Sequence, residues 1–502
     1  MKIALFLPEI TSETEKEINL LQNDFEVQIF LPPFDDKKIL NLRDRVDLIY
    51  VWQDTDLAEN IAQNKYILQV PLIYRQLDFL NKAEDKKQKI EHIYNEADKI
   101  ILTNDEFEKN WLDLKFDIYE QKKVLSIANP AIIPLIKELI NKNKDYKLTL
   151  CFFGSFDQFC TRNRTLLKGL AKNKVKIIKI NDHSLKLKKF WRLWRMHKKI
   201  RNDYDIMFVA FQGQSITSLA WLLARLNGKK IVLDALFSLY DSVVLDRREV
   251  APNTFRAKFL HFLDWSACRL ADLIIVHTKF HQEFFMKEFN LHSRENKFMT
   301  LYVGSDDELL YPKPELRPRA GEFIVHFHGS YIPVQGLEKV IIGAAKILKE
   351  EKIIFNLVGK GQALPEAKRL VKEWNLTDVN FIEPVPYREL GDYMNRSDVC
   401  LGSFGTSPKI MRVVPLKVFE SLACERALIT ARTPAVLQLL TERENCLLTE
   451  LGDPSDLAKK IMELKNNPEL KEKIARNGYR LFREELTPRV TVKKLVERIS
   501  TL

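Results

Sequence analysis

Glycine is absent from the first 153 residues of this 502-residue chain, although the whole sequence contains 16 glycines. A loop without glycine rarely lets a phosphate or a sugar approach its backbone closely. The first 140 residues are therefore expected to form a degenerate domain with a structural or docking role. Small-molecule chemistry is expected further along the chain.

Long apolar runs and paired cysteine motifs are also lacking. No stretch of 18 apolar residues occurs, so no membrane-spanning helix is expected. The opening stretch MKIALFLPEI stops at Pro8 and Glu9, which indicates a buried strand rather than a signal peptide. The six cysteines form no CxxC pair and are expected to be reduced core thiols of a cytosolic protein. They lie at positions 151, 160, 268, 400, 424 and 446.

The net charge of +11 is distributed unevenly. Residues 1–140 carry 18 Lys and Arg against 26 Asp and Glu, a net charge of −8. Residues 141–319 carry 33 against 18, a net charge of +15, and residues 320–502 carry 28 against 24. A localised positive field indicates an anionic partner surface, either nucleic acid or a phospholipid bilayer.

Residues 186–201, KLKKFWRLWRMHKKIR, form the basic amphipathic segment of this middle third. At helical spacing one stripe of the segment holds Phe190, Leu193, Trp194 and His197. Lys, Arg and Trp together suit the headgroup region of an anionic membrane. A core helix with a solvated basic face is an alternative, and so is RNA binding by stacking. Because no RNA-binding signature accompanies the segment, no nucleic-acid partner is expected.

A second aromatic helix is predicted over residues 255–270, with Phe255, Phe259, Phe262 and Trp265 at helical spacing. Aromatic stripes of this kind are more often part of a core than of a binding surface. This stripe is therefore expected to be buried.

The first 320 residues contain a repeat of strands and helices. The order found in residues 1–140 returns in residues 147–310, with Asp47 matching Asp205, Ala97-Asp98 matching Ala271-Asp272, and Asn129 matching Gly304. Short apolar strands that alternate with helices predict an α/β fold of parallel, doubly wound, Rossmann-like sheets. Functional loops of such sheets lie at the carboxyl ends of the strands.

Two carboxylates follow one of the predicted strands. KKIVLDALFSLYDS places Asp234 at the end of a strand and Asp241 in the loop beyond it. Carboxylates at such a position can bind hydroxyls or act as an acid or base. Either residue could equally be a helix cap.

The stretch RVVPLKVFESLACERA, residues 412–427, predicts a helix that opens on Leu416 or Lys417 after Pro415. Lys417 then lies at the start of the helix, where free N–H groups and the helix dipole favour an anion. Glu420 lies one turn further on the same face, about 5 to 6 Å away. A cation for phosphate and a carboxylate for vicinal hydroxyls would suit a nucleoside-diphosphate sugar. The alternative is an ordinary surface Lys–Glu pair.

From about residue 147 to residue 480 the chain resembles retaining glycosyltransferases of family 4, which have the GT-B fold. Four motifs carry this resemblance, in the order in which that family has them. They are Gly329 with QG at 335–336, VGKGQ at 358–362, VPYREL at 385–390 and PLKVFESLA at 415–423.

The resemblance implies four domains or segments. A degenerate Rossmann-like repeat covers 1–140, the acceptor-binding and membrane-facing domain covers 146–312, and the nucleotide-sugar domain covers 320–485. A C-terminal helix over 486–502 is expected to pack back on the second of these.

The resemblance also implies roles for particular residues. Glu420 would bind ribose, Lys417 the diphosphate, and Val385 would lie beside the nucleobase. Gly329, Gln335, Gly336 and Gly359 would form the phosphate loops. That family often has a second glutamate where this chain has Arg412. Lys409 and Arg412 are expected to supply positive charge that binds the diphosphate.

The carboxylates and histidines of the chain complete this picture. Asp234 and Asp241 would position the acceptor, without a dedicated catalytic base. No metal or other cofactor is expected, since His326 and His328 have no third ligand nearby in the sequence and are expected to be packing residues.

The expected function is transfer of a sugar to a lipid-linked or cell-envelope glycan, in polysaccharide biosynthesis. The protein is expected to be cytoplasmic and peripherally bound to the inner face of the membrane through residues 186–201. The alternative is a non-catalytic GT-B-like scaffold of a polysaccharide assembly complex.

Overall fold

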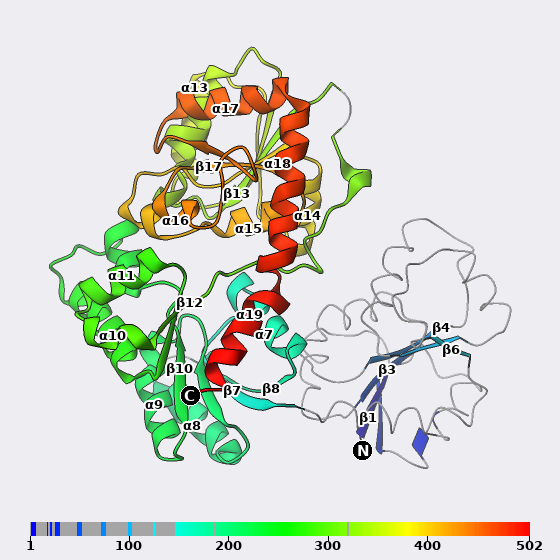
Figure 1. Cartoon of the computed structure of the whole chain (residues 1–502), viewed down its shortest axis with the longest axis vertical. Coiled ribbons are helices and arrows are strands. Elements are labelled where there is room, and N and C mark those ends of the chain that lie inside the picture. Colours follow the sequence, from blue (N-terminus) through cyan, green and yellow to red (C-terminus); the bar gives the residue numbers. More distant parts are fainter. Residues whose placement is uncertain are drawn as a thin grey trace. The chain divides into compact units, whose positions relative to one another are not determined.

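The computed structural model describes residues 146–184, 187–318 and 321–502. In the earlier part of the chain it describes six strands, Ile18, Leu21 and Gln22. The chain divides into two compact units, Met1–Lys147 and Leu148–Leu502. Three six-stranded sheets, with only parallel pairings between their strands, are distributed over these units (Figure 1).

The first unit contains one sheet with the strand order β2-β1-β3-β4-β5-β6. The strand predicted at the opening stretch is β1 of this sheet. The repeat positions Asp47, Ala97, Asp98 and Asn129 lie outside the described residues. The strands are β1 (Lys2–Phe6), β2 (Glu26–Phe30), β3 (Leu48–Trp52), β4 (Leu72–Gln76), β5 (Lys99–Leu102) and β6 (Val124–Ser126).

The N-terminal domain of the second unit repeats this topology. Its strand order, β8-β7-β9-β10-β11-β12, is the order of the first unit, which supports the predicted duplication of a Rossmann-like half. The strands are β7 (Leu148–Gly154), β8 (Val175–Asn181), β9 (Ile206–Val209), β10 (Lys230–Asp234), β11 (Leu273–Val276) and β12 (Phe298–Thr300).

The matching aspartates have a structural role wherever the structure describes them. Asp205, just before β9, accepts a hydrogen bond from the N–H of Thr149 at 2.8 Å. Asp272, just before β11, accepts one from the N–H of Ile231 at 3.0 Å. Each carboxylate thus binds the backbone at the start of the neighbouring strand and helps to fix the register of the sheet.

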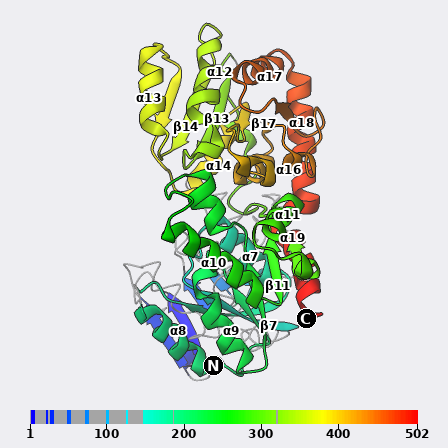
Figure 2. The ribbon, with the colours of Figure 1, turned by 90° about the vertical axis from the view of Figure 1, so that its left-hand side faces the viewer.

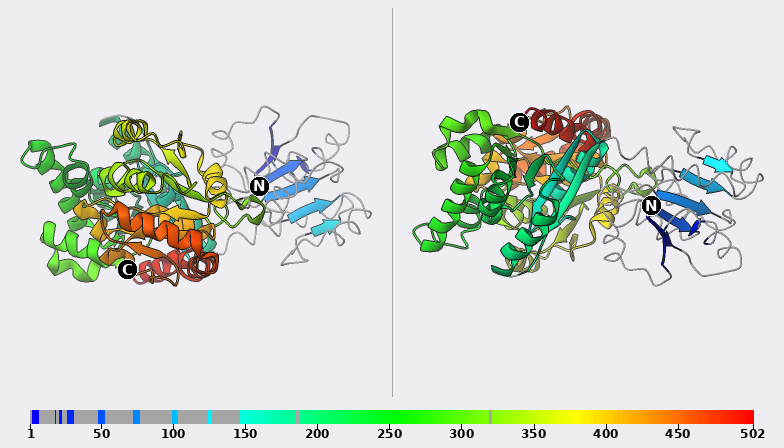
Figure 3. Two further views of the ribbon diagram at one scale, coloured as in Figure 1. Left: turned by 90° about the horizontal axis from the view of Figure 1, so that it is seen from above. Right: turned by 90° about the horizontal axis from the view of Figure 1, so that it is seen from below.

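Helices cover both faces of this sheet (Figures 1 and 2). Right-handed crossovers place α8 to α11 on one face and α7 on the other, where α19 packs against α7. The red helix α19 follows the C-terminal domain in sequence and lies beside the N-terminal one (Figure 3). The helices are α7 (Thr161–Lys172), α8 (Leu187–Ile200), α9 (Thr217–Arg225), α10 (Phe255–Leu270), α11 (Lys279–Glu288) and α19 (Pro488–Ile499).

Helix α10 corrects one expectation from the sequence. Its Phe255, Phe259 and Phe262 are exposed rather than buried, because Ala257, Asp264, Ala267 and Cys268 form the face that packs on the domain. In α8 the expected stripe is divided: Leu193 and His197 are buried, whereas Trp194 is exposed. Periodicity finds such stripes, but the neighbouring elements decide which one is covered.

The C-terminal domain has the strand order β15-β14-β13-β16-β17-β18. Its strands are β13 (Ile324–Gly329), β14 (Ile354–Gly359), β15 (Val379–Ile382), β16 (Val399–Leu401), β17 (Ala427–Ala431) and β18 (Leu447–Thr449). Its helices are α12 (Ile342–Ile347), α13 (Leu364–Glu373), α14 (Tyr387–Asn395), α15 (Leu416–Ala423), α16 (Pro434–Leu437), α17 (Pro454–Asn466) and α18 (Pro468–Leu481). Two Rossmann-like domains, together with the similar first unit, confirm the predicted fold class.

Cysteines and membrane spans complete the description. All six cysteines are free, and five of them are buried. In the described part of the chain, no helix is both long and apolar enough to cross a membrane.

Candidate active site

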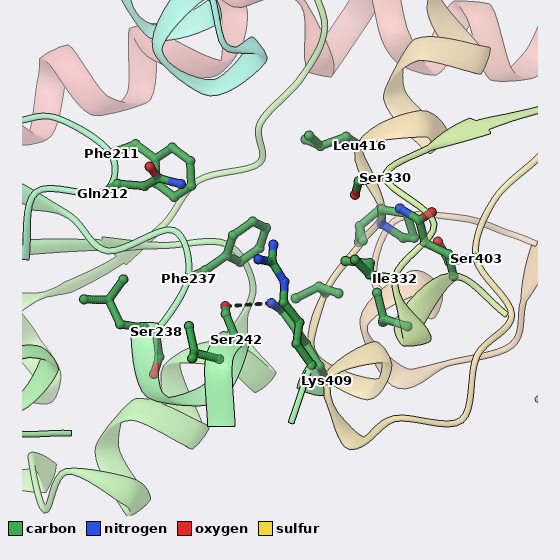
Figure 4. Close-up of a pocket in the computed structure, with 18 of the residues that line it drawn as sticks. Phe211, Gln212, Phe237, Ser238, Ser242, Ser330, Ile332, Ser403, Lys409 and Leu416 are labelled. Carbon is green, nitrogen blue, oxygen red and sulfur yellow. Dashed lines mark hydrogen bonds between the residues drawn. The ribbon is translucent and has the colours of Figure 1, made fainter. Parts of the chain in front are cut away.

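A cavity of about 310 Å³ lies between the two domains of the second unit. Loops that follow β9 and β10 line one side of it, and loops that follow β13 and β16 line the other together with the start of α15. Figure 4 shows Phe211, Gln212 and Phe237 across the cavity from Ser330 and Ser403. Loops at the carboxyl ends of strands from two parallel sheets therefore converge on one space.

Lys417 lies at the wall of this cavity. Helix α15 begins at Leu416, directly after Pro415, as the sequence predicted. Lys417 is 5% exposed, and its Nζ lies 3.5 Å from Ser403 Oγ and 4.9 Å from the centre of the Phe327 ring. No carboxylate within 4.0 Å pairs with it among the described residues. A buried cation at the start of a helix and at a cavity wall is well placed to bind an anion.

The pKa of Lys417 reflects this lack of a close carboxylate partner. Burial lowers the pKa from its usual 10.5 to about 8, and the charge of Glu420 offsets burial only in part. An anion brought into the cavity would stabilise the charged ammonium and raise this pKa again. Anion binding and protonation of Lys417 are therefore coupled.

Glu420 lies at the end of a chain of hydrogen bonds in the C-terminal domain. Its Oε2 is 2.8 Å from His328 Nε2, and His328 Nδ1 is 3.0 Å from His326 Nε2. Burial acts to raise the pKa of Glu420, but hydrogen bonds from His328 and Tyr387 and the charge of Lys417 outweigh it and hold the pKa below its usual value. The carboxylate is thus kept ionised and in a fixed orientation.

The two histidines were expected to be packing residues, and both are buried, but His328 also makes a hydrogen bond with Glu420. An ionised carboxylate only accepts hydrogen bonds, so His328 must donate through Nε2 to Glu420. The sequence placed Glu420 far from the pair, because 92 positions separate it from His328. Among the described residues no group of three or more His, Cys, Asp or Glu side chains is arranged to hold a metal ion.

Glycines let the loops of the C-terminal domain approach one another closely. Gly336 has φ of +72°, and a Cβ there would lie 2.7 Å from the backbone nitrogen of Gly405. Gly359 has φ of +144°, and a Cβ there would lie 2.0 Å from the carbonyl oxygen of Gly329. Gly329 ends β13 directly before Ser330, and Gln335 lines the cavity. Gly329, Gly336 and Gly359 do not line the cavity themselves, whereas Gln335 does, as does Ser330 next to Gly329.

Arg412 and Lys409 are bound to the N-terminal domain. The Arg412 guanidinium lies 2.5 Å from Asp241, and Lys409 Nζ lies 4.0 Å from Asp246. Figure 4 shows the hydrogen bond from Lys409 Nζ to Ser242 Oγ, at 2.8 Å. Lys409 still lines the cavity, whereas Arg412 is not among the lining residues. The expectation that Arg412 faces a diphosphate is thus corrected, because the carboxylate of Asp241, 171 positions away, holds its charge.

The two carboxylates after β10 do not face an acceptor. Asp234 is fully buried and forms two hydrogen bonds with Arg162, at 2.8 and 3.0 Å. Asp241 is equally buried and binds Arg412. Since a side chain sealed in the protein cannot touch a substrate, the expected acceptor contacts of Asp234 and Asp241 are both wrong for this conformation.

Val385 does not line the cavity either. It packs, partly buried, on the hydrophobic cluster that includes Val358, Leu390 and Val418. The hydroxyl of Tyr387, two positions further on, lies 3.3 Å from Oγ of Ser305, which belongs to the N-terminal domain. These contacts do not place Val385 where it could lie beside a nucleobase bound in the cavity.

Several lining residues were not singled out from the sequence. They include Ser330, Ser403 and Phe237, and the Phe237 ring centre lies 4.7 Å from Lys409 Nζ. Serine and phenylalanine are common in loops and cores, so their types alone carry no signal. Their positions directly after predicted strands were the one available clue.

Comparison with known proteins agrees with this architecture. Residues 341–497 match the family described as Glycosyl transferase-like. Two uncharacterized glycosyltransferases of Methanocaldococcus jannaschii are similar in sequence. MJ1178 is 26% identical over 184 residues, 37% of this chain and 48% of MJ1178, so the match spans about half of that relative. MJ1069 is 22% identical over 328 residues, 62% of this chain and 79% of MJ1069.

A solved structure shares the fold. HepE of Anabaena, crystallised with UDP-glucose, is 15% identical and superposes with a TM-score of 0.55 over 71% of this chain and 100% of HepE. Residues 341–497 therefore carry a glycosyl transferase-like domain, and 71% of this chain shares the fold of HepE.

Proposed function

We propose that this protein is a glycosyltransferase that uses a nucleoside-diphosphate sugar. The observation that carries the proposal is Lys417, a buried lysine with a depressed pKa at the wall of the cavity between the domains. A diphosphate would supply the negatively charged partner that the Lys417 ammonium does not have within the described part of the protein. Glu420, one turn further along α15 and held by His328, supplies a carboxylate for the ribose hydroxyls.

The proposed reaction retains the configuration of the transferred sugar. The bond between the anomeric carbon and the phosphate oxygen breaks, and the acceptor oxygen forms the new bond on the same face of the sugar. The acceptor proton passes to the departing diphosphate, so no separate base is needed. Lys417 and the free N–H groups at the start of α15 stabilise the charge that develops on the leaving group.

No step of this reaction assigned to the chain requires a metal ion. Asp234 and Asp241 have no place in it, because both are sealed in ion pairs. We propose direct donor contacts for Lys417, Lys409 and Gln335, which line the cavity, and for Glu420, which lies one turn further along α15, is 4% exposed and does not line the cavity. Lys409 and Lys417 provide positive charge, and Gln335 provides an amide that can bind phosphate oxygens or sugar hydroxyls.

The acceptor that we propose is a lipid-linked or cell-envelope glycan, reached at the inner face of the membrane. Helix α8, which covers residues 187–200 of the basic segment, supports this location with its exposed Trp191 and Trp194. The protein would then act in the cytoplasm as a peripheral membrane enzyme of polysaccharide biosynthesis.

A donor screen tests the proposal. The thermal stability of the full chain would be measured with UDP-, GDP- and TDP-sugars, beginning with UDP-glucose, and hydrolysis of each donor would be followed. At a concentration of about 100 times the dissociation constant the correct donor should stabilise the protein by about 2.7 kcal/mol. Absence of both stabilisation and hydrolysis with every donor would overturn the proposal.

A non-catalytic scaffold is the second candidate. The observation in its favour is that Arg412 and Lys409 are engaged by the N-terminal domain, which leaves fewer cations for a diphosphate. In a scaffold, Lys417→Met would leave function in cells intact. In an enzyme the same variant would abolish it.

A further inference from the structure

Exposed apolar side chains gather on one face of the N-terminal domain. Of the 13 large apolar side chains that are exposed in the described part of the chain, seven lie on the adjacent helices α8, α9 and α10, and an eighth, Leu226, directly follows α9. Figure 2 shows these three helices side by side, turned toward the viewer. The eight are Trp191, Trp194, Met196, Leu222, Leu226, Phe255, Phe259 and Phe262. We call this surface the α8–α10 face.

The α10 part of this face is the most apolar. Phe255, Phe259 and Phe262 follow one another at helical spacing and are 85%, 49% and 53% exposed. The opposite side of α10 attaches the helix to the domain, where Asp264 accepts hydrogen bonds from Ser238 Oγ at 2.7 Å and from the backbone. The three phenylalanines are therefore not needed to hold α10 in place. Such a contiguous aromatic stripe in water indicates a contact surface.

The α8 part of the face supplies positive charge. Helix α8 contains six Lys and Arg residues and no acidic residue. The exposed indoles lie among these cations: Arg195 is 5.4 Å from the Trp191 ring centre, and Lys198 is 5.8 Å from that of Trp194. Leu193 and His197, which is 2.8 Å from the Tyr204 hydroxyl, anchor the other side of α8. The charge and the indoles thus both face solvent.

We propose that the α8–α10 face docks onto an anionic phospholipid bilayer. Charge complementarity favours this partner, since α8 presents only cations. Tryptophan prefers the headgroup region, which matches α8. Phenylalanine partitions deeper, at the boundary of the acyl chains, which matches the stripe on α10. Helix α8 then provides attraction to the headgroups and α10 provides insertion.

This face also lies close to the cavity. The loop between the cavity and α10 runs from Arg247, which lines the cavity, to Thr254, which caps α10. Ala257 of α10 packs with Val244 and Val250 in one small cluster. The Phe255 end of α10 is therefore the end nearer to the cavity. This placement suits an acceptor anchored in the bilayer, and that conclusion rests on the proposed function. The docking of the α8–α10 face onto a bilayer does not depend on the proposed function.

Vesicle flotation tests the docking. The full chain and the variant Phe255→Ser/Phe259→Ser/Phe262→Ser would be mixed with phosphatidylcholine vesicles, with and without phosphatidylglycerol. We expect the wild type to float only with phosphatidylglycerol, and the variant to partition on the order of tenfold less. The single variant Phe255→Ser changes the most exposed side chain and should give a smaller loss without affecting folding.

The chain offers a matched control. Ile347→Ser/Leu437→Ser removes two side chains of the C-terminal domain that are 54% and 50% exposed, and it should float like the wild type. Equal flotation of the α10 variant and this control would overturn the proposal. So would a wild-type dimer in light scattering that the α10 variant converts to monomer, because a second copy would then cover the face.

Donor binding separates this inference from the proposed function. Stabilisation of the α10 variant by a nucleotide sugar should equal that of the wild type. Loss of flotation with intact donor binding supports docking. Flotation of a wild type that binds no donor would refute the proposed function alone.

Discussion

Lys417→Met should make the protein more stable in the absence of a nucleotide and unable to bind one. The lysine is buried, and its pKa is lowered by burial from 10.5 to about 8. One pKa unit corresponds to about 1.36 kcal/mol, so holding the charged ammonium in place costs about 3 kcal/mol at neutral pH. Methionine fills a similar volume without the charge.

The expected gain is somewhat less than this cost. Removing Lys417 also removes a cation that favours the ionised form of Glu420. We expect the free energy of unfolding at neutral pH to rise by about 2 kcal/mol. Urea unfolding of the full chain, with an unchanged m-value, measures this gain.

The pH dependence of the gain has a definite sign. The folded-state pKa of Lys417 is below the unfolded value, so its cost is fully present below about pH 8. Between about pH 8 and about pH 10.5 the folded wild type loses the proton while the unfolded chain keeps it, and the wild type becomes more stable. The advantage of the variant should therefore shrink across this window.

Lys346→Met is the matched control. Lys346 is exposed on α12, with its Nζ 4.2 Å from the Trp374 ring centre, so this variant also removes a cation beside an aromatic ring. It should gain no stability and should bind nucleotide sugars normally. A Lys417→Met protein that is no more stable than the wild type, yet still stabilised by a nucleotide sugar, would refute the assignment of Lys417 to the diphosphate.

Three further predictions concern the same site and its support. Affinity for a nucleoside-diphosphate sugar, measured by calorimetry, should be level below about pH 8 and fall up to tenfold per pH unit above it, as Lys417 loses its proton. His328→Leu removes the hydrogen bond to Glu420 and should weaken nucleotide-sugar binding about tenfold while leaving pyrophosphate binding unchanged. Arg162→Met should lower the free energy of unfolding by about 3 kcal/mol, because Asp234 is left as a buried, unpaired charge.

Each of these has its own check. His328→Gln keeps an N–H donor and should retain most of the nucleotide-sugar affinity, and equal losses for pyrophosphate would show a general disturbance instead. The double variant Arg162→Met/Asp234→Leu should recover much of the lost stability. A flat affinity up to about pH 10 would mean that Lys417 does not carry the pH dependence.

Local features of the structure were predictable from the sequence because their causes are local. The start of α15 follows from Pro415 and the apolar spacing behind it. The strands of the N-terminal domain follow from short apolar runs between turn residues. Lys417 could be placed at the start of α15 because its position depends only on where the helix begins.

Long-range pairing was not predictable. Arg412 could be expected to bind a phosphate until its partner Asp241 was known, and Asp234 could be expected to bind an acceptor until Arg162 was known. Each pair joins residues far apart in the chain, so no spacing rule connects them. The orientation of α10 was hidden for the same reason, since the side that packs depends on Ser238 and its neighbours.

The return of the chain to the N-terminal domain limits how the two domains can move. The chain passes to the C-terminal domain between Leu310 and Phe323 and comes back at Thr487, where α19 begins against α7. The two crossings lie close together, since a Cβ on Gly304 would lie 2.4 Å from the carbonyl oxygen of Leu486. Two neighbouring tethers would act as a hinge that favours opening and closing of the cavity over twisting of the domains. Substrate entry would then widen the cavity without changing which loops face each other.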